Sequence, residues 1–456
     1  MPSSDAPPID RPNVLFIIAD DWSPLAGCYG SDFIATPHID RFAERGTVFD
    51  HAFCASPSCA VSRASILTGQ HSHTHGQYGH CHGIHGFRTH QSMPSTPKLL
   101  RDAGYATGLI GKKHCEPWSV YPFEVELHPH QMDTRSPAAF ERKVGAFLEY
   151  AADRPFYCHV GISDPHRGGD DSQYDNDWAH EGDEPVHYNA EHVPVPGFLP
   201  DTPETRRDLA EYYRAVSRFD QCVGATLRAL ERSGRAEQTL VIVTSDHGMP
   251  FPGAKASSFE GGHHCPLIVA SPSQQQRGIH NRALVNWLDF MPTVLAWCGV
   301  SAPDNLPGRS LLPILAQTDP DGWDEVVYSH CFHEVTNYYP YRVLRGRRYK
   351  YVRNLAWQLR TPLPTDLFRS RTWQSVLSRD VEMLGERPRE HFLQQPREAL
   401  YDLQDDPHET TTLIDKPELA ETVEAMRQRL TDFRVQTADP WLEVCFQEGE
   451  VAAHNV

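Results

Sequence analysis

The sequence predicts an α/β fold: a large, mostly parallel sheet sandwiched by helices, followed by a smaller C-terminal α+β subdomain. Residues 13–19 are continuously apolar and β-branched and end in two acids, which is typical of a strand buried in a parallel sheet. Further apolar runs alternate with helical patterns, and this alternation implies right-handed crossovers with helices on both faces. The pattern changes after about residue 315. We therefore expect a main domain over residues 1–320, and a subdomain with a small antiparallel sheet and a terminal helix over residues 321–456.

The individual elements follow from local signals along the chain. Thr36-Pro37 begins a short helix, because proline is favoured in the first helical turn. The longest amphipathic pattern runs from residue 202 to about residue 233. Other helices are expected over residues 94–103, 138–152, 285–298 and 417–433. Strands are expected over residues 106–110, 156–162, 239–244, 266–270 and 326–330, with a hairpin around Gly346.

Composition excludes several classes of protein. The 456 residues carry 42 basic and 60 acidic side chains, a net charge of −18, which argues against nucleic acid as a partner. The 11 cysteines lack Cys-x-x-Cys pairs, which favours reduced thiols in a cytosolic protein. Residues 1–11 lack the apolar core of a signal peptide, and no apolar run approaches the roughly 20 residues that span a membrane. We expect a cytoplasmic protein without a membrane partner, and no pattern specifies its oligomeric state.

Acidic side chains follow two of the predicted strands. Asp20 and Asp21 come directly after the first strand, and Asp246 and His247 follow the strand over 239–244. Ligands of open α/β sheets bind at the carboxyl ends of the strands, so these four side chains are expected to converge. Carboxylates with one further donor suit a hard divalent cation such as Ca²⁺, Mg²⁺ or Mn²⁺. The alternative is that these acids only cap the helices that follow.

A cysteine and several basic side chains complete the candidate site. Cys59 is predicted at the start of a helix, where the positive end of the helix dipole lowers a thiol pKa, and Arg63 lies one turn further on. Lys112, His114 and His166 follow two other predicted strands and would form an anion-binding pocket beside the metal. The alternative is a buried structural cysteine with ordinary loop residues around it.

Four motifs in this order resemble those of the type I sulfatases in the alkaline-phosphatase-like superfamily. They are RPNVLFIIADD, CAVSRASILTG, GKKH and SDHG, and residues 400–409 resemble the C-terminal signature of that family. Several stretches look closer to one branch, the heparan N-sulfatases, also called N-sulfoglucosamine sulfohydrolases or sulfamidases. These stretches are residues 110–114, 120–123, 163–167, 333–336, 339–342 and 407–409.

The resemblance implies roles for the motif residues. Asp20, Asp21, Asp246 and His247 would bind a divalent cation, usually Ca²⁺ in sulfatases, and Cys59 would complete the ligand set. A maturation enzyme would convert Cys59 to formylglycine, whose hydrated aldehyde is the nucleophile.

The same resemblance assigns the catalytic cations. Arg63 and Lys112 would hold the aldehyde hydrate and the sulfate. His114 would help to break down the sulfated intermediate, and His166 would contact the leaving group. Lys255 would clamp a sulfate oxygen.

One residue departs from the family pattern. The modification signal is Cys-x-Pro-x-Arg or Cys-x-Ala-x-Arg, and this chain has Val61 at the middle position. A protein that keeps Cys59 as a thiol is expected to bind a metal but to hydrolyse sulfate esters feebly.

The C-terminal part is expected to contribute substrate contacts. His333, Glu334 and Arg342 lie in stretches that resemble the sulfamidase branch, so we expect them to contact a sulfated amino sugar. The alternative for the basic residues around Gly346 is a solvated hairpin face. Six histidines between residues 71 and 85 form a second metal site, a pocket rim or a simple surface loop.

The sequence therefore predicts a metal-dependent sulfatase that removes an N-sulfo or O-sulfo group from a small sulfated molecule, most simply a sulfated amino sugar. Two alternatives remain at this point. One is a phosphonate monoester or phosphodiester hydrolase of the same superfamily. The other is a non-catalytic protein that binds sulfated glycans and lacks the modified Cys59.

Overall fold

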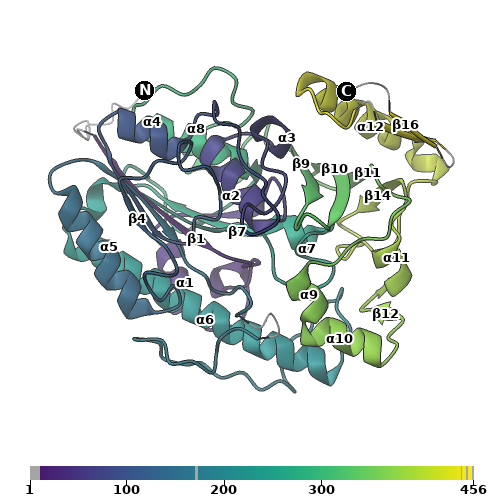
Figure 1. Ribbon diagram of the computed structural model, residues 1–456, viewed down its shortest axis with the longest axis horizontal. Helices are drawn as coiled ribbons and strands as arrows, with labels where there is room; N and C mark the ends of the chain where they lie inside the picture. The colour runs from purple at the N-terminus through teal and green to yellow at the C-terminus, as the bar shows by residue number, and fades with distance from the viewer. Residues whose placement is uncertain (1–10, 170–172, 443, 448–449, 454–456) are drawn as a thin grey trace.

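The computed structural model describes residues 11–169, 173–442, 444–447 and 450–453. Its main feature is an eight-stranded sheet in the order β4-β3-β5-β1-β6-β7-β2-β8 (Figure 1). The strands are β1 (Asn13–Ala19), β2 (Thr47–Phe53), β3 (Ala106–Gly111), β4 (Val125–Leu127), β5 (Phe156–Gly161), β6 (Thr239–Ser245), β7 (His264–Ala270) and β8 (Ile279–Asn286).

Strand β1 lies in the middle of this sheet and shows why its sequence is continuously apolar. Leu15 and Ile17 pack into the core on one face, whereas Phe16 and Ile18 pack into the core on the other. Helices α1 (Pro37–Ala43), α5 (Pro137–Ala151) and α6 (Pro203–Arg232) cover the first face. Helices α2 (Cys59–Thr68), α4 (Thr96–Asp102) and α8 (Phe290–Trp297) cover the second, as Figure 1 shows. The predicted sandwich is confirmed.

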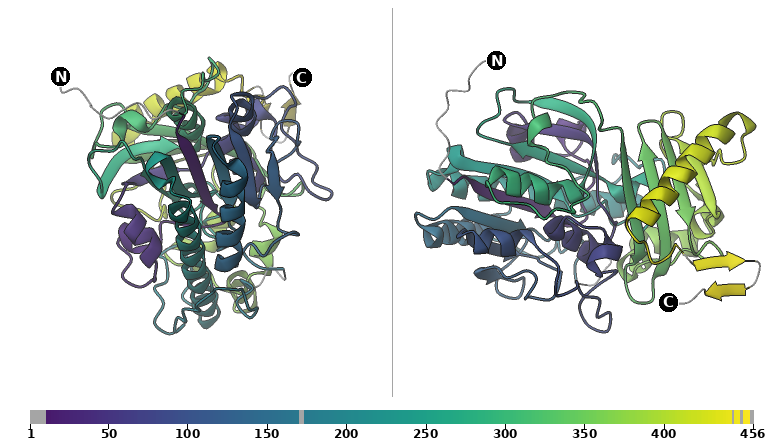
Figure 2. Two further views of the ribbon diagram at one scale, coloured as in Figure 1. Left: turned by 90° about the vertical axis from the view of Figure 1, so that its left-hand side faces the viewer. Right: turned by 90° about the horizontal axis from the view of Figure 1, so that it is seen from above.

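A second, antiparallel sheet lies beside the large one (Figure 2, right). Its order is β14-β11-β10-β9, with β9 (Glu325–Phe332), β10 (Tyr338–Gly346), β11 (Tyr349–Asn354) and β14 (Glu398–Asp402). The predicted hairpin around Gly346 is the β10–β11 connection. Helix α12 (Ala420–Gln436) packs on one face of this sheet, and α10 (Arg371–Ser378) packs against the other.

The remaining elements are short. They are α3 (Ser72–His75), α7 (Glu260–His263), α9 (Thr365–Arg369), α11 (Arg389–Leu393), β12 (Met383–Leu384), β13 (Arg387–Pro388), β15 (Val444–Gln447) and β16 (Glu450–Ala453). The ten cysteines from Cys28 to Cys331 carry free thiols, as the sequence predicted. Within the described part of the chain, every helix is too short or too polar to cross a membrane.

The expected helix over residues 285–298 is partly wrong. Strand β8 continues to Asn286, one turn of 3₁₀ helix covers Trp287–Asp289, and α8 begins only at Phe290. Asn286 ends the strand by capping that turn, since its side chain accepts a hydrogen bond from the Leu288 N–H. Strand β2 was not predicted. It runs antiparallel to β7 and parallel to β8, so the sheet is mixed at this edge.

Candidate active site

Four neighbouring parallel strands bring the predicted motifs together. β3, β5, β1 and β6 are consecutive in the sheet, and each is parallel to its neighbours. Their last residues are also in register: Gly111 pairs with Gly161, and Ala19 pairs with Ser245. The residues that follow each strand therefore emerge at one edge of the sheet, where open α/β folds bind ligands.

Three buried carboxylates occupy this edge. Asp20, Asp21 and Asp246 are each at most 1% exposed. The Asp21 N–H donates to Asp246 Oδ1 at 3.1 Å. Asp21 has a backbone φ of 69°, a left-handed conformation in which Asp is tolerated better than most residues, and the chain thereby turns at the end of β1.

Arg63 and Lys112 oppose two of these carboxylates. Arg63 lies inside helix α2 and is fully buried. Its Nε is 2.9 Å from Asp246 Oδ2, and its Nη2 is 3.4 Å from Asp20 Oδ1. Lys112 forms an ion pair with Asp20, and its carbonyl accepts a hydrogen bond from Arg63 Nη1 at 3.0 Å. Arg63 thus links the ends of β1, β3 and β6.

Lys255 holds the third carboxylate from the opposite side. Its Nζ is 3.0 Å from Asp21 Oδ2 and 2.7 Å from Asp366 Oδ2, and its side chain is fully buried. Asp366 belongs to the short helix α9, in an irregular stretch that contains no motif. Sequence reasoning missed Asp366 because only the fold brings this part of the chain to the strand ends.

His247 is fixed in one tautomer. Its Nδ1–H donates to the Gly248 carbonyl at 3.0 Å, which leaves the lone pair of Nε2 free. Nε2 lies 3.2 Å from Asp21 Oδ1 and 3.2 Å from Cys59 Sγ. Burial and the nearby Lys255 hold the pKa of His247 well below its usual range, so the imidazole is neutral.

Cys59 is the first residue of helix α2, as predicted, but the expected direction of its pKa is wrong. Burial raises the pKa of the Cys59 thiol well above its usual value. The side chain is 1% exposed, and desolvation of a thiolate outweighs the attraction of Lys255. An unmodified Cys59 is therefore a neutral thiol and a poor nucleophile.

The donor set fits a divalent cation. Ligand atoms of Asp21, Cys59 and His247 lie within 4.8 Å of one another, and the same holds for Asp20, Cys59 and Asp246. Asp21 Oδ1 is buried and accepts no hydrogen bond. Burial, followed by the charge of Asp20, raises the pKa of Asp246 to about 7, and a cation would stabilise both carboxylates in their charged form.

A cavity of about 450 Å³ opens beside these residues. Its lining includes Asp20, Lys112, His114, Arg135 and His166. His166 Nδ1–H donates to the Arg167 carbonyl at 2.6 Å, so Nε2 carries the lone pair. Burial and Lys255 lower the pKa of His166 to about 3.

The predicted substrate contacts from the C-terminal part lie in different places. His333 is 3% exposed, and its Nε2 is 3.0 Å from His80 Nε2. Glu334 accepts hydrogen bonds from the N–H and the hydroxyl of Thr365, both at 2.9 Å, next to Asp366.

The predicted substrate contact of Arg342 is wrong, because the structure does not bring this side chain to the cavity. Its guanidinium is fully buried and forms a bidentate pair with Asp439, with Nε and Nη2 each 2.8 Å from a carboxylate oxygen. Its stretch resembles the sulfamidase branch, yet here this arginine ties the small sheet to the C-terminal segment.

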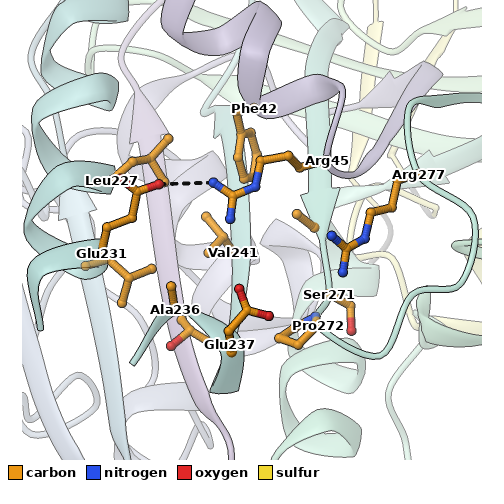
Figure 3. A pocket seen from close by; sticks show the side chains of 13 residues that line it. Phe42, Arg45, Leu227, Glu231, Ala236, Glu237, Val241, Ser271, Pro272 and Arg277 are labelled. Atoms are coloured by element: carbon orange, nitrogen blue, oxygen red, sulfur yellow. Dashed lines mark hydrogen bonds and ion pairs between the residues drawn. The ribbon is translucent and has the colours of Figure 1, made fainter. Parts of the chain in front are cut away.

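A different hollow lies at the opposite edge of the large sheet (Figure 3). Its lining includes Thr239, the first residue of β6, together with an ion pair between Arg45 and Glu231 at 3.1 Å. Its volume is about 50 Å³, too small for a sugar, and the hollow lies away from the strand ends that carry the motifs.

Comparisons with known proteins agree with this geometry. The sulfatase family model matches residues 12–300, and the model for the C-terminal part of N-sulphoglucosamine sulphohydrolase matches residues 254–359. The chain is 37% identical to human N-sulphoglucosamine sulphohydrolase, over 96% of this chain and 92% of that protein.

Solved structures share the fold at lower identity. A protein in complex with its substrate D-glucosamine-2-N,6-O-disulfate has a TM-score of 0.68 and 21% identity, over 94% of this chain and 99% of that chain. The phosphonate monoester hydrolase of Agrobacterium radiobacter has a TM-score of 0.68 and 19% identity, over 98% of this chain and 100% of that chain. Motifs at four adjacent strand ends, the family model and the 37% identical relative place this chain in the sulfatase family, whose members hydrolyse sulfuric esters and sulfamates.

Proposed function

We propose that this protein removes the N-sulfo group from a short sugar that ends in N-sulfated glucosamine. The observation that carries the proposal is the match of residues 254–359 to the C-terminal model of N-sulphoglucosamine sulphohydrolase. That segment supplies Lys255 to the buried charge network and carries Glu334, which bonds the residue next to Asp366. The 37% identity to the human enzyme of that name, over nearly the whole chain, supports the same substrate class.

We further propose Ca²⁺ as the cation, held by Asp20, Asp21, Asp246 and His247 with Cys59 beside them. Three carboxylates form a hard, oxygen-rich set, which suits Ca²⁺ and also accommodates Mg²⁺ or Mn²⁺. When bound, the cation supplies positive charge to the sulfate oxygens. Formylglycine, made from Cys59 by a maturation enzyme, supplies a hydrated aldehyde as the nucleophile.

The side chains of this protein stabilise the transferred sulfo group. Arg63 and Lys112 already lie at the buried carboxylates, so their positive charge is in place before the substrate arrives. Lys255 supplies a third cation from the opposite side. Preorganised charge in a pocket that contains little water stabilises a transition state with negative charge on the sulfate oxygens.

His166 is suited to deliver a proton to the departing nitrogen. It lines the cavity, and its Nε2 is free because Nδ1 bonds the Arg167 carbonyl. The free imidazole is neutral at pH 7. An anionic substrate in the cavity raises the pKa of His166 and shifts its equilibrium toward the protonated form, which can donate to the departing nitrogen.

A panel of four substrates tests this proposal: glucosamine N-sulfate, glucosamine 6-sulfate, an aryl sulfate and an aryl phosphonate monoester. We expect the N-sulfate to have the highest kcat/KM by at least about tenfold, because that difference needs only about 1.4 kcal/mol of differential binding. A higher kcat/KM on the phosphonate would favour the phosphonate hydrolase alternative. Tight binding of all sulfated sugars without turnover would favour the non-catalytic alternative.

A further inference from the structure

A group of histidines on the cavity rim is unexplained by the proposed reaction. His80 and His82 lie in the loop after α3, and His114 follows β3. His82 Nδ1 is 2.9 Å from His114 Nε2. The ring centroid of His80 is 5.0 Å from that of His82 and 4.7 Å from that of His114.

The nitrogen atoms of this trio have the spacing of metal ligands. One ring nitrogen from each of the three histidines lies within 4.8 Å of the other two. Zinc binds imidazole nitrogen at roughly 2.0–2.1 Å, so tetrahedral ligands sit about 3.4 Å apart. The 2.9 Å between His82 Nδ1 and His114 Nε2 is close to that spacing, and His82 is exposed.

The protonation and hydrogen bonding of the trio leave lone pairs available. The pKa of each of the three imidazoles lies below its usual value, chiefly because of burial. The Nδ1 atoms of His80 and His114 are buried and lack a hydrogen-bond partner. Neither ring is therefore held by hydrogen bonds at both of its nitrogens.

We propose that His80, His82 and His114 form a second metal site, separate from the carboxylate site, that binds Zn²⁺. Imidazole ligands favour zinc over calcium, whereas the three-carboxylate site favours hard cations. His333 lies outside this group and orients the His80 ring, because its Nε2 is 3.0 Å from His80 Nε2. The trio therefore leaves one tetrahedral position open.

The site has a consequence for activity, which rests on the proposed role of His114 in sulfate chemistry. An imidazole that holds zinc cannot also act on the sulfated substrate. Zinc at this site is therefore an inhibitor, and its effect depends on His80 and His82 although neither touches the sulfate.

A zinc-binding measurement tests the site independently of turnover. The full-length protein is first saturated with millimolar Ca²⁺, dialysed against Zn²⁺, and its bound zinc is counted by elemental analysis. We expect His82→Asn to weaken zinc binding at one site by more than about 100-fold, because losing a ligand costs at least as much as losing a supporting residue. His82 is exposed, so this variant keeps the fold.

His130→Asn is the matched control, since His130 is an exposed histidine outside the trio. We expect it to bind zinc like the unchanged protein. Equal zinc stoichiometry and affinity in the His82→Asn variant and the unchanged protein would overturn the second site. In the activity arm, micromolar Zn²⁺ should inhibit the unchanged protein and spare His82→Asn. Zinc binding that depends on His82 but leaves turnover unaffected would overturn the inhibitory role alone.

Discussion

Each buried cation of the site forms ion pairs with two carboxylates. Lys255 stands between Asp21 and Asp366, and Arg63 stands between Asp20 and Asp246. Each cation keeps a carboxylate charged where burial alone would favour its protonated form. In the proposed function the same cations stabilise the negative charge of a bound sulfate.

Replacing Lys255 by Met should reduce both the catalytic efficiency and the stability of the protein. We expect kcat/KM on glucosamine N-sulfate to fall by about 1,000-fold, because one preorganised charge is lost. The free energy of unfolding should fall by about 3–5 kcal/mol, because Asp21 and Asp366 lose a buried partner. Steady-state kinetics and chemical denaturation measure the two effects. An unchanged kcat/KM in this variant would show that Lys255 does not stabilise the transferred sulfo group.

Replacing Arg342 by Met should reduce the stability of the protein without impairing substrate binding. Arg342 is buried against Asp439 and does not line the cavity, so we expect lower stability with little change in KM. The loss should be about 3 kcal/mol, because Asp439 keeps a second partner in Arg434 at 3.0 Å. Denaturation midpoints and KM for glucosamine N-sulfate separate the two roles. A large rise in KM at unchanged stability would instead support the prediction that Arg342 contacts the substrate.

Sequence reasoning at this scale succeeded where a residue sits next to a strand end. Asp20, Asp246, Lys112 and His166 all follow strands whose apolar runs are evident from the sequence. It failed for the pKa of Cys59, because that pKa is set mainly by burial, which depends on the whole fold.

At the scale of elements, helix α2 determines how Cys59 and Arg63 are presented. The Ser62 N–H donates to the Ser58 carbonyl at 2.8 Å as the first helical hydrogen bond, so Val61 lies in the first turn. N–H groups in the first turn have no partner within the helix. Arg63 lies one turn after Cys59 and points to the strand ends, which explains the spacing of the motif.

Val61→Pro should therefore keep the fold and improve maturation. Proline in the first turn removes no helical hydrogen bond, and we expect a stability change within about 1 kcal/mol. The variant restores the Cys-x-Pro-x-Arg pattern, so the fraction of protein with an aldehyde at residue 59 should rise. Peptide mass spectrometry of both proteins from the same host measures that fraction. Val61→Ala serves as the control that restores the other accepted pattern, and an equal fraction in all three proteins would contradict the expectation.

Element prediction failed where local signals are mixed. Residues 279–286 read Ile-His-Asn-Arg-Ala-Leu-Val-Asn and lack a regular alternation, so β8 was not predicted, and its last two residues were assigned to the expected helix over residues 285–298. Asp366 lies in the five-residue helix α9, which has no motif and reaches the site only through the fold.

At the scale of the whole molecule, the net charge of −18 does not prevent binding of an anion. Arg63, Lys112 and Lys255 gather at one edge of the sheet, and the local field decides what binds there. The acidic surface is expected to favour short sugars over long polyanionic chains. The fold class and the small C-terminal sheet were predictable because they depend on patterns that repeat over many residues.

Buried histidines should make the stability of the whole protein depend on pH. Burial lowers the pKa of His75, His159 and His330 to about 3 each, below the unfolded value of about 6.5. The folded state therefore binds fewer protons than the unfolded state. The contribution of these histidines to the free energy of unfolding is fully present above pH 6.5 and is lost as the pH falls toward 3. One such histidine accounts for roughly 3 kcal/mol by pH 4.

His159→Phe tests this dependence, because His159 stacks on Phe16 in the core and phenylalanine keeps that contact. We expect the free energy of unfolding of the variant to change less between pH 6.5 and pH 4 than that of the unchanged protein. Denaturant titrations at several pH values measure both slopes, and equal slopes would rule out His159 as a contributor.

The proposed reaction requires Cys59 to act as formylglycine. We would measure the mass of the peptide that contains residue 59 in a catalytically active preparation. We expect an aldehyde or its hydrate at residue 59, in a proportion that follows the rate of sulfate release from glucosamine N-sulfate. Full activity in a preparation whose Cys59 is entirely an unmodified thiol would refute the formylglycine mechanism.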